Sequence, residues 1–176
     1  MKQPKRVSWK LAALASILVL GGVLLVACSN DGNGATNVPS GIAPSDPNGE
    51  GVRDDVRRYI EITHQDSAKA RAALFQYAKV VEDALADAND KQLSVQHGEE
   101  TSRASECLTY TLGDDVTAAN KSYMIKQDLR PIILNTDERN KAYFIYNDQL
   151  GGEVFKGIPY DQRASACEIN PSTLPN

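Results

Sequence analysis

The sequence is poor in the residue types and motifs that usually carry catalysis or bind metals. It has only two histidines, His64 and His97, and three cysteines, and neither histidine lies at the spacing of a zinc ligand. It contains no Gly-x-Ser-x-Gly, His-Glu-x-x-His, Ser-x-x-Lys or Cys-x-x-Cys motif, and no P-loop. We therefore expect a protein that is not an enzyme and that holds no cofactor or metal ion, with both histidines as solvated surface residues.

The sequence also lacks the excess of positive charge that is typical of nucleic-acid-binding proteins. It has 19 Lys and Arg against 23 Asp and Glu, which gives a net charge of −4. Residues 1–27 hold four of the positive charges and no negative one, so the rest of the chain carries −8. Because an acidic surface repels phosphate, nucleic acid is excluded as an expected partner.

The N-terminus is basic and then strongly apolar. Its positive charges are followed by an uncharged run over residues 11–26, which is broken only by Ser16, Gly21 and Gly22. This run of 16 residues is shorter than the roughly 20 that a transmembrane helix needs. It fits the apolar part of a signal peptide better, although a membrane span and an ordinary secretory peptide cut near Ala27 remain alternatives.

The apolar run ends in Leu-Val-Ala-Cys at residues 25–28, and this pattern resembles the signal peptide of bacterial lipoproteins. The resemblance covers residues 1–29 only. It implies cleavage between Ala27 and Cys28, followed by attachment of diacylglycerol and often a further acyl chain, such as palmitate, to Cys28. Two or more chains hold a protein stably on a membrane. The resemblance also implies the periplasm-facing side of the bacterial envelope, where Ser29 favours the outer membrane.

Residues 28–51 form an expected linker between the lipidated cysteine and a single globular domain over residues 52–176. From residue 29 onward the linker has five Gly, three Pro and four Asn and almost nothing apolar. Such a composition cannot bury enough surface to offset the entropy of ordering the chain. We expect a flexible tether.

An apolar stripe at helical spacing runs through residues 53–88. Its members recur every three or four residues, as on one face of an amphipathic helix: Val56, Ile60, Leu74, Ala78, Val81 and Leu85. The stripe weakens over residues 63–69, where Asp66 or Ser67 could cap a new helix. The segment is therefore either one long helix or two helices joined at residues 64–67.

The next segment mixes a turn signal with a helical pattern. Residues 89–102 are polar and contain Gly98, which predicts a turn there. Residues 104–112 favour a helix that ends at Gly113, although large residues also alternate over 108–112 as they do in a strand.

Residues 115–130 favour another helix, which Pro131 should limit at or before Arg130, or kink. The apolar run over residues 132–134 fits a short strand or a buried turn. Asn135 then resembles the cap of a last helix, because Glu138 follows it by three residues. Gly151 and Gly152 end that helix.

Three or four helices with short connections predict a mainly α protein, a small antiparallel bundle with an irregular C-terminal tail. The alternative is an α+β domain with a small sheet from residues 107–112, 121–126 and 131–134. Cys107 and Cys167 are an even pair once Cys28 is lipidated, so an oxidising compartment predicts a disulfide that holds the tail. Two free thiols or a metal pair are the alternatives.

The most concentrated aromatic run outside the N-terminal region is at residues 143–146. Four consecutive large side chains point round most of a helix, so at least one should reach the surface. Aromatic residues at a surface are typical of protein interfaces, which makes Tyr143, Phe144 and Tyr146 the candidate partner-binding residues; core packing is the alternative.

These features predict a lipid-anchored, non-enzymatic protein-binding module of the bacterial envelope. Inhibitor, immunity and exclusion lipoproteins and accessory parts of envelope machines share this design. One alternative is a cell-wall (peptidoglycan) hydrolase that uses Glu99 or Glu100 in a groove with aromatic residues. A second alternative is a structural spacer with a long self-associating helix.

Overall fold

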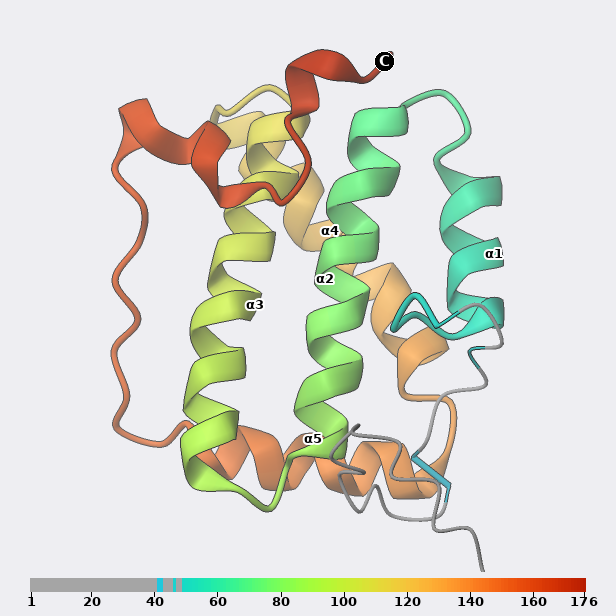
Figure 1. The fold of residues 1–176 in the computed structure, drawn as a ribbon, viewed down its shortest axis with the longest axis vertical. Helices are drawn as coiled ribbons and strands as arrows, with labels where there is room; N and C mark the ends of the chain where they lie inside the picture. The colour runs from blue at the N-terminus through green and yellow to red at the C-terminus, as the bar shows by residue number, and fades with distance from the viewer. Residues whose placement is uncertain (1–40, 43–45, 47–48) are drawn as a thin grey trace, which may run out of the picture. The chain divides into compact units, whose positions relative to one another are not determined.

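The protein is mainly α-helical with an irregular C-terminal tail. The computed structural model describes residues 41–42, 46 and 49–176, and these contain no strand. Five α-helices follow in order: α1 (Asp54–Thr63), α2 (Ala68–Ala86), α3 (Lys91–Thr111), α4 (Val116–Ile133) and α5 (Asp137–Gln149) (Figure 1). Two 3₁₀ helices, Tyr160–Ala166 and Pro171–Thr173, lie in the tail. The prediction of a helical bundle is confirmed, and the α+β alternative is wrong for this part of the chain.

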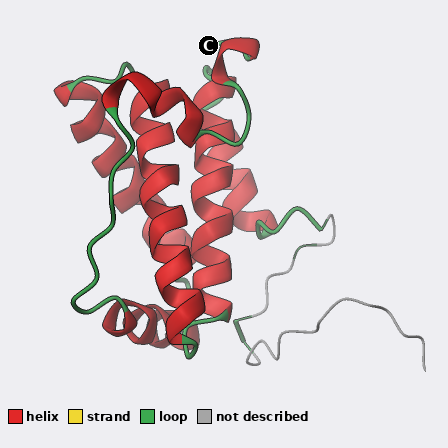
Figure 2. Ribbon diagram, turned by 60° about the vertical axis from the view of Figure 1, so that its left-hand side comes forward, coloured by secondary structure: helices red, strands yellow, loops and turns green. Residues whose placement is uncertain are grey.

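The helices α2 and α3 lie side by side and form the centre of the bundle (Figures 1 and 2). α1 and α4 contact each other and α2, while α5 crosses one end of the α2–α3 pair. The tail returns past α3 to the opposite end. The core takes apolar residues from all five helices, including Ile60, Leu74, Leu85, Leu108 and Leu129.

The apolar stripe over residues 53–88 is divided between two helices, α1 and α2, which confirms the prediction of two helices over that of one long helix. Ser67 caps α2, since its hydroxyl accepts from the amide of Ala70 at 3.1 Å. The Arg71 guanidinium closes the corner by donating to the carbonyls of His64 and Gln65, at 2.9 and 2.7 Å. The break at residues 64–67 is therefore fixed on both sides.

The turn predicted within residues 89–102 lies at the start of that segment, over residues 87–89, and not at Gly98, because α3 begins after Asp90 and continues through the glycine. Asp90 caps the helix by accepting from the amides of Gln92 and Leu93. Gly98 is needed for close packing: a Cβ at this position would lie 2.4 Å from Cζ of Phe155. Helix rather than strand is confirmed for residues 104–111, Leu112 caps the helix, and Gly113, with φ of 130°, follows the cap.

Of the two effects predicted for Pro131, a helix end at or before Arg130 is wrong, since α4 runs through the proline to Ile133. Proline removes one amide donor, but the next turn still closes with a bond of 2.8 Å from the Leu134 amide to the Arg130 carbonyl. Residues 132 and 133 are thus the end of a helix and not a strand or turn. The cap of α5 is Thr136, one residue after the predicted Asn135.

Three charged side chains lie buried where α1 begins. Arg139 is paired with Glu82, and Arg53 lies 3.8 Å from the other oxygen of that carboxylate. The two guanidinium groups also donate to the carbonyls of Ile132 and Ile133, which end α4. Burial raises the pKa of Glu82, and the two arginines oppose that shift. The cluster ties α1, α2, α4 and α5 together.

The predicted disulfide between Cys107 and Cys167 is present, with 4.9 Å between the Cα atoms. It joins α3 to the tail just after the 3₁₀ helix Tyr160–Ala166. Cys107 itself is buried in the core.

Candidate functional site

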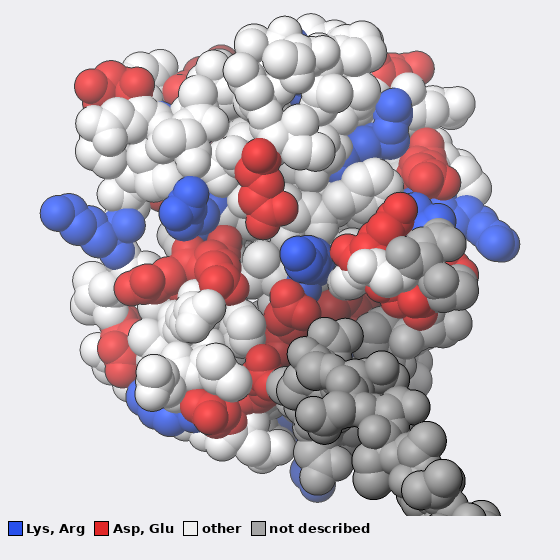
Figure 3. Space-filling view, in the orientation of Figure 1, with Lys and Arg blue, Asp and Glu red and all other residues white. Residues whose placement is uncertain are grey.

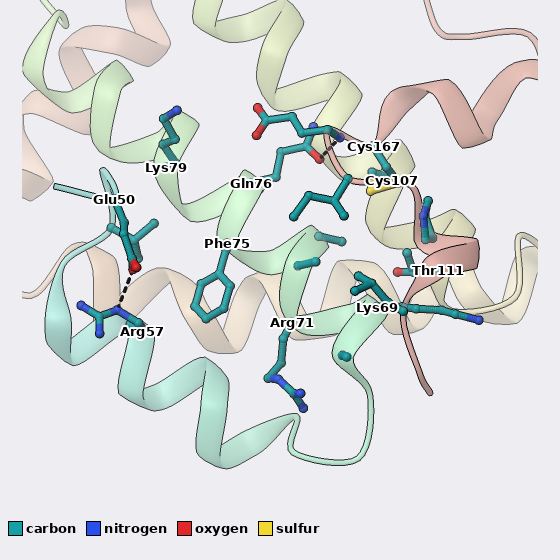
Figure 4. A pocket seen from close by; sticks show the side chains of 18 of the residues that line it. Glu50, Arg57, Lys69, Arg71, Phe75, Gln76, Lys79, Cys107, Thr111 and Cys167 are labelled. Atoms are coloured by element: carbon teal, nitrogen blue, oxygen red, sulfur yellow. Dashed lines mark hydrogen bonds and ion pairs between the residues drawn. A yellow bond between two sulfur atoms is a disulfide. The ribbon is translucent and has the colours of Figure 1, made fainter. Parts of the chain in front are cut away.

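The larger of the two hollows described for this part of the chain is a groove between α1, the first half of α2 and the tail, with a volume of about 510 Å³ (Figure 4). Its floor is mainly apolar and comes from Ala72, Ala73 and Phe75 of α2 and from Ile169 and Leu174 of the tail. Four cations and three carboxylates stand around this floor: Arg57, Lys69, Arg71, Lys79, Glu50, Glu61 and Glu168. We refer to these residues together as the α2 groove.

The tail wall of the α2 groove is fixed by hydrogen bonds as well as by the disulfide. The Gln76 side chain donates to the Ala166 carbonyl at 2.9 Å and accepts from the Glu168 amide at 3.1 Å. Near the chain end, the Ala68 amide at the start of α2 donates to the Pro175 carbonyl at 3.1 Å. The tail is therefore held at both ends of this wall.

The opposite wall is set by charged residues that already have partners. Arg57 of α1 forms ion pairs with Glu50, at 3.2 Å, and with Asp54. Arg71 is held by the carbonyls that end α1. These bonds fix the two guanidinium groups before any ligand binds, which lowers the entropy that binding would cost.

Two lysines at the groove differ from the arginines. Within the described residues, neither the Lys69 nor the Lys79 side chain donates a hydrogen bond or forms an ion pair, although the stem of Lys79 packs on Gly51. The groove has more cations than acids, in a chain whose net charge is negative. Figure 3 shows Asp and Glu side chains gathered over the middle of the face formed by α2 and α3. Lys69 and Lys79 are thus the groove cations without an ion pair among the described residues, although the charge of Lys79 also acts on Asp83 and Glu100.

A second, smaller hollow of about 350 Å³ lies beside the first and is lined mainly by charged residues, among them Asp83, Glu100 and Arg103. Burial raises the pKa of Asp83, which His97 and Lys79 oppose. Burial also raises the pKa of Glu100, but hydrogen bonds from Gln96 and His97 outweigh it and leave the pKa lowered. No aromatic residue lines this hollow.

His97 is buried, with 7% of its surface exposed, so the expectation of a solvated histidine is wrong here. Its Nε2 lies 3.0 Å from an Asp87 oxygen and its Nδ1 lies 2.9 Å from a Glu100 oxygen. A neutral imidazole can donate from only one nitrogen, so this arrangement favours the imidazolium. Burial lowers the pKa of His97, and the two carboxylates reverse that effect, so the pKa is raised. His64 is half-buried, and burial and Lys121 lower its pKa.

The three predicted partner-binding aromatics lie outside the α2 groove, and the Tyr143 ring lies next to the rings of Phe144 and Tyr146, with 6.3 Å between the ring centroids in each pair. Tyr146 is a core residue with 6% of its surface exposed, so its ring is not available to a partner in this structure. Tyr143 is half-buried and lies beneath the Arg130 guanidinium, 5.6 Å from it. Only Phe144 is largely exposed, at 66%. The run over residues 143–146 therefore contains both a core residue, Tyr146, and a surface residue, Phe144.

Glu99 and Glu100, the carboxylates named for the hydrolase alternative, lie in different surroundings. Glu99 is exposed on α3, whereas Glu100 accepts from Gln96 and His97. The hydrolase alternative requires a groove that is lined by one of these carboxylates and by aromatic residues. Glu100 does line a hollow, but no aromatic residue lines it.

Sequence reasoning did not find the α2 groove. One residue, Gln76, could have indicated that another segment packs against α2. It is a polar residue on the buried side of the helix, and a buried amide requires hydrogen-bond partners. Those partners lie about 90 residues away in the tail and could not be named from the sequence.

Cys28 and the apolar run at residues 11–26 lie outside the described residues. Among the helices that are described, none has both the length and the apolar character needed to cross a membrane. The same part of the chain holds no group of three or more His, Cys, Asp or Glu side chains suited to a metal ion. No family model, no curated protein and no solved structure matches this chain.

Proposed function

We propose that this chain is a lipid-anchored, periplasm-facing protein-binding module of the bacterial envelope without catalytic activity, and that the α2 groove is its contact surface. The observation that carries the proposal is the groove itself, which combines an apolar floor, walls held by internal bonds and two unpaired lysines. Its volume lies within the range of specific ligand sites, roughly 300–1,000 Å³.

The occupant that fits the α2 groove is an extended segment of a partner protein that carries an apolar side chain and a carboxylate. The apolar side chain would cover Phe75 and Ile169, which removes apolar surface from water. The carboxylate would pair with Lys69 or Lys79. Because neither lysine side chain forms an ion pair within the described residues, its pairing with the partner's carboxylate does not require an internal ion pair to break.

The test is a pull-down from bacterial envelope extract with the chain from Cys28 onward as bait. Bait with Lys69→Glu and Lys79→Glu reverses both groove lysines. Matched bait with Lys141→Glu and Lys156→Glu makes the same charge change at exposed positions outside the groove. We expect one specific protein that the unchanged and matched baits retain and the groove bait loses. Equal retention by all three baits would exclude the groove as the contact surface.

The cell-wall hydrolase remains a second candidate because Asp83 and Glu100 line one hollow and their pKa values shift in opposite directions. Such a pair is typical of an acid and a base in glycoside hydrolysis. A zymogram of the purified chain on peptidoglycan tests it: clearing that Asp83→Asn abolishes would favour the hydrolase over the binding module.

The structural spacer has less support, because its single long helix is two shorter ones, α1 and α2, joined by a fixed corner.

A further inference from the structure

Two residues of the segment expected to be a free tether lie against the folded domain. Ile42 is 6% exposed and belongs to the apolar core. Its carbonyl accepts from Nη1 of Arg139 at 2.6 Å. Gly41 lies beside α5, since a Cβ at this position would be 3.4 Å from Cγ of Glu138. The chain therefore meets the domain at α5, ten residues before the expected start of the domain.

The contact of Ile42 with Arg139 completes a buried hydrogen-bond set. The Arg139 side chain is almost fully buried, and its guanidinium donates to the carbonyl of Ile133 and pairs with Glu82. A buried guanidinium needs acceptors for its N–H groups, because an unsatisfied buried donor is costly. The Ile42 carbonyl is one of these acceptors, and the Ile42 side chain adds apolar burial at the same place.

We propose that Gly41 and Ile42 form a docking clamp that holds the lipid-anchored chain with α5 towards the membrane and the end of the bundle that carries the 3₁₀ helix Tyr160–Ala166 away from it. This inference rests on the proposed lipid at Cys28. Figure 1 shows α5 and that 3₁₀ helix at opposite ends of the α2–α3 pair. The point at which the anchored chain meets the domain decides which end lies nearer the lipid.

The clamp also shortens the chain between lipid and domain. Only the residues between Cys28 and Gly41 then separate the two, and this stretch reaches at most about 45 Å whatever its conformation. Without the clamp, the chain would be released as far as Glu50, which pairs with Arg57, and its reach would be about 75 Å. The clamp thus limits the distance at which the α2 groove meets a partner.

The experiment measures energy transfer from a fluorophore on the protein to acceptor lipids in vesicles of phosphatidylethanolamine and phosphatidylglycerol. The fluorophore is attached through a non-natural amino acid at position 141 on α5 or at position 161 in the first 3₁₀ helix, both exposed in the structure. Two anchors are compared: the lipid added by the cell, and a synthetic lipid coupled to the thiol of Cys28. Ile42→Asp breaks the clamp, and Ile42→Val is its matched control.

We expect stronger transfer from position 141 than from position 161, with a distance difference of at most the length of α2, about 28 Å. Ile42→Asp should weaken transfer from position 141, while Ile42→Val should not. Equal transfer from both positions, or an Ile42→Asp chain that keeps the original transfer, would overturn the clamp. If the cell adds no lipid, only the first anchor fails, and the synthetic anchor still decides whether the clamp exists.

Discussion

Removal of the disulfide between Cys107 and Cys167 tests how the tail is held. The bond closes a loop of 60 residues, for which the chain-entropy relation gives about 4 kcal/mol as an upper value. Strain and residual structure in the unfolded chain reduce this value, so we expect a loss of about 2–4 kcal/mol. For a domain of this size, the loss lowers the melting temperature by roughly 8–20 °C.

The burial of the two cysteines predicts that their replacements will differ. Cys107 is buried in the core, whereas Cys167 is half-buried. Both Cys107→Ser and Cys167→Ser break the bond, but only Cys107→Ser also places a hydroxyl in the apolar core, which costs roughly 1–3 kcal/mol more. The double replacement should therefore match Cys107→Ser closely, since either change alone removes the bond.

The assay is thermal and urea unfolding of the chain from Cys28 onward, with and without reductant, beside a count of thiols under denaturing conditions. The Gln76 bonds should keep the tail attached at low temperature, so the native circular dichroism should be unchanged. A melt that does not respond to reductant, or a Cys167→Ser chain less stable than Cys107→Ser, would refute this reasoning.

Three further predictions follow from single residues. The pKa of His97 is raised in the folded protein, so the contribution of His97 to stability is complete below its unfolded pKa of about 6.5 and is lost as pH rises through the folded pKa. Urea unfolding from pH 6 to 9 should show this decline in stability, and the His97→Gln variant should not show it. Gly98→Ala should destabilise the protein by about 1–3 kcal/mol in urea unfolding through its clash with Phe155, although alanine favours helices; a more stable variant would contradict the packing argument. Cys28→Ala should abolish partition into detergent, and unchanged partition would favour a membrane span over a lipid anchor.

Most of the features that the sequence predicted correctly depend on residues close to one another in the chain. Ser67 ends one apolar stripe and caps the next helix, and Gly113 follows α3 in a positive-φ conformation. The disulfide followed from an even pair of cysteines in an expected oxidising compartment, a case in which only one pairing exists. Local chemistry was sufficient for the two helix ends, and the count of cysteines was sufficient for the disulfide.

The features that it did not predict depend on contacts between distant residues. A glycine such as Gly98 is typical of a turn when only its neighbours in the chain are considered. Here it allows Phe155, 57 residues further on, to pack against the helix backbone. Arg139 and Glu82 would be surface residues by composition, yet they pair in the core across a similar separation. The α2 groove likewise requires the tail to lie along α2, which the sequence of neither segment states.

The central claim, that the α2 groove binds a partner protein, is tested most directly by photo-crosslinking in intact bacteria that contain the full chain. A photoreactive amino acid at Ile169 lies in the groove, and the same group at Val154 is exposed outside it. We expect one discrete cross-linked protein from position 169, which Lys69→Glu with Lys79→Glu abolishes, and no such product from position 154. No product from position 169, or the same products from both positions, would exclude the α2 groove as the surface that binds a partner.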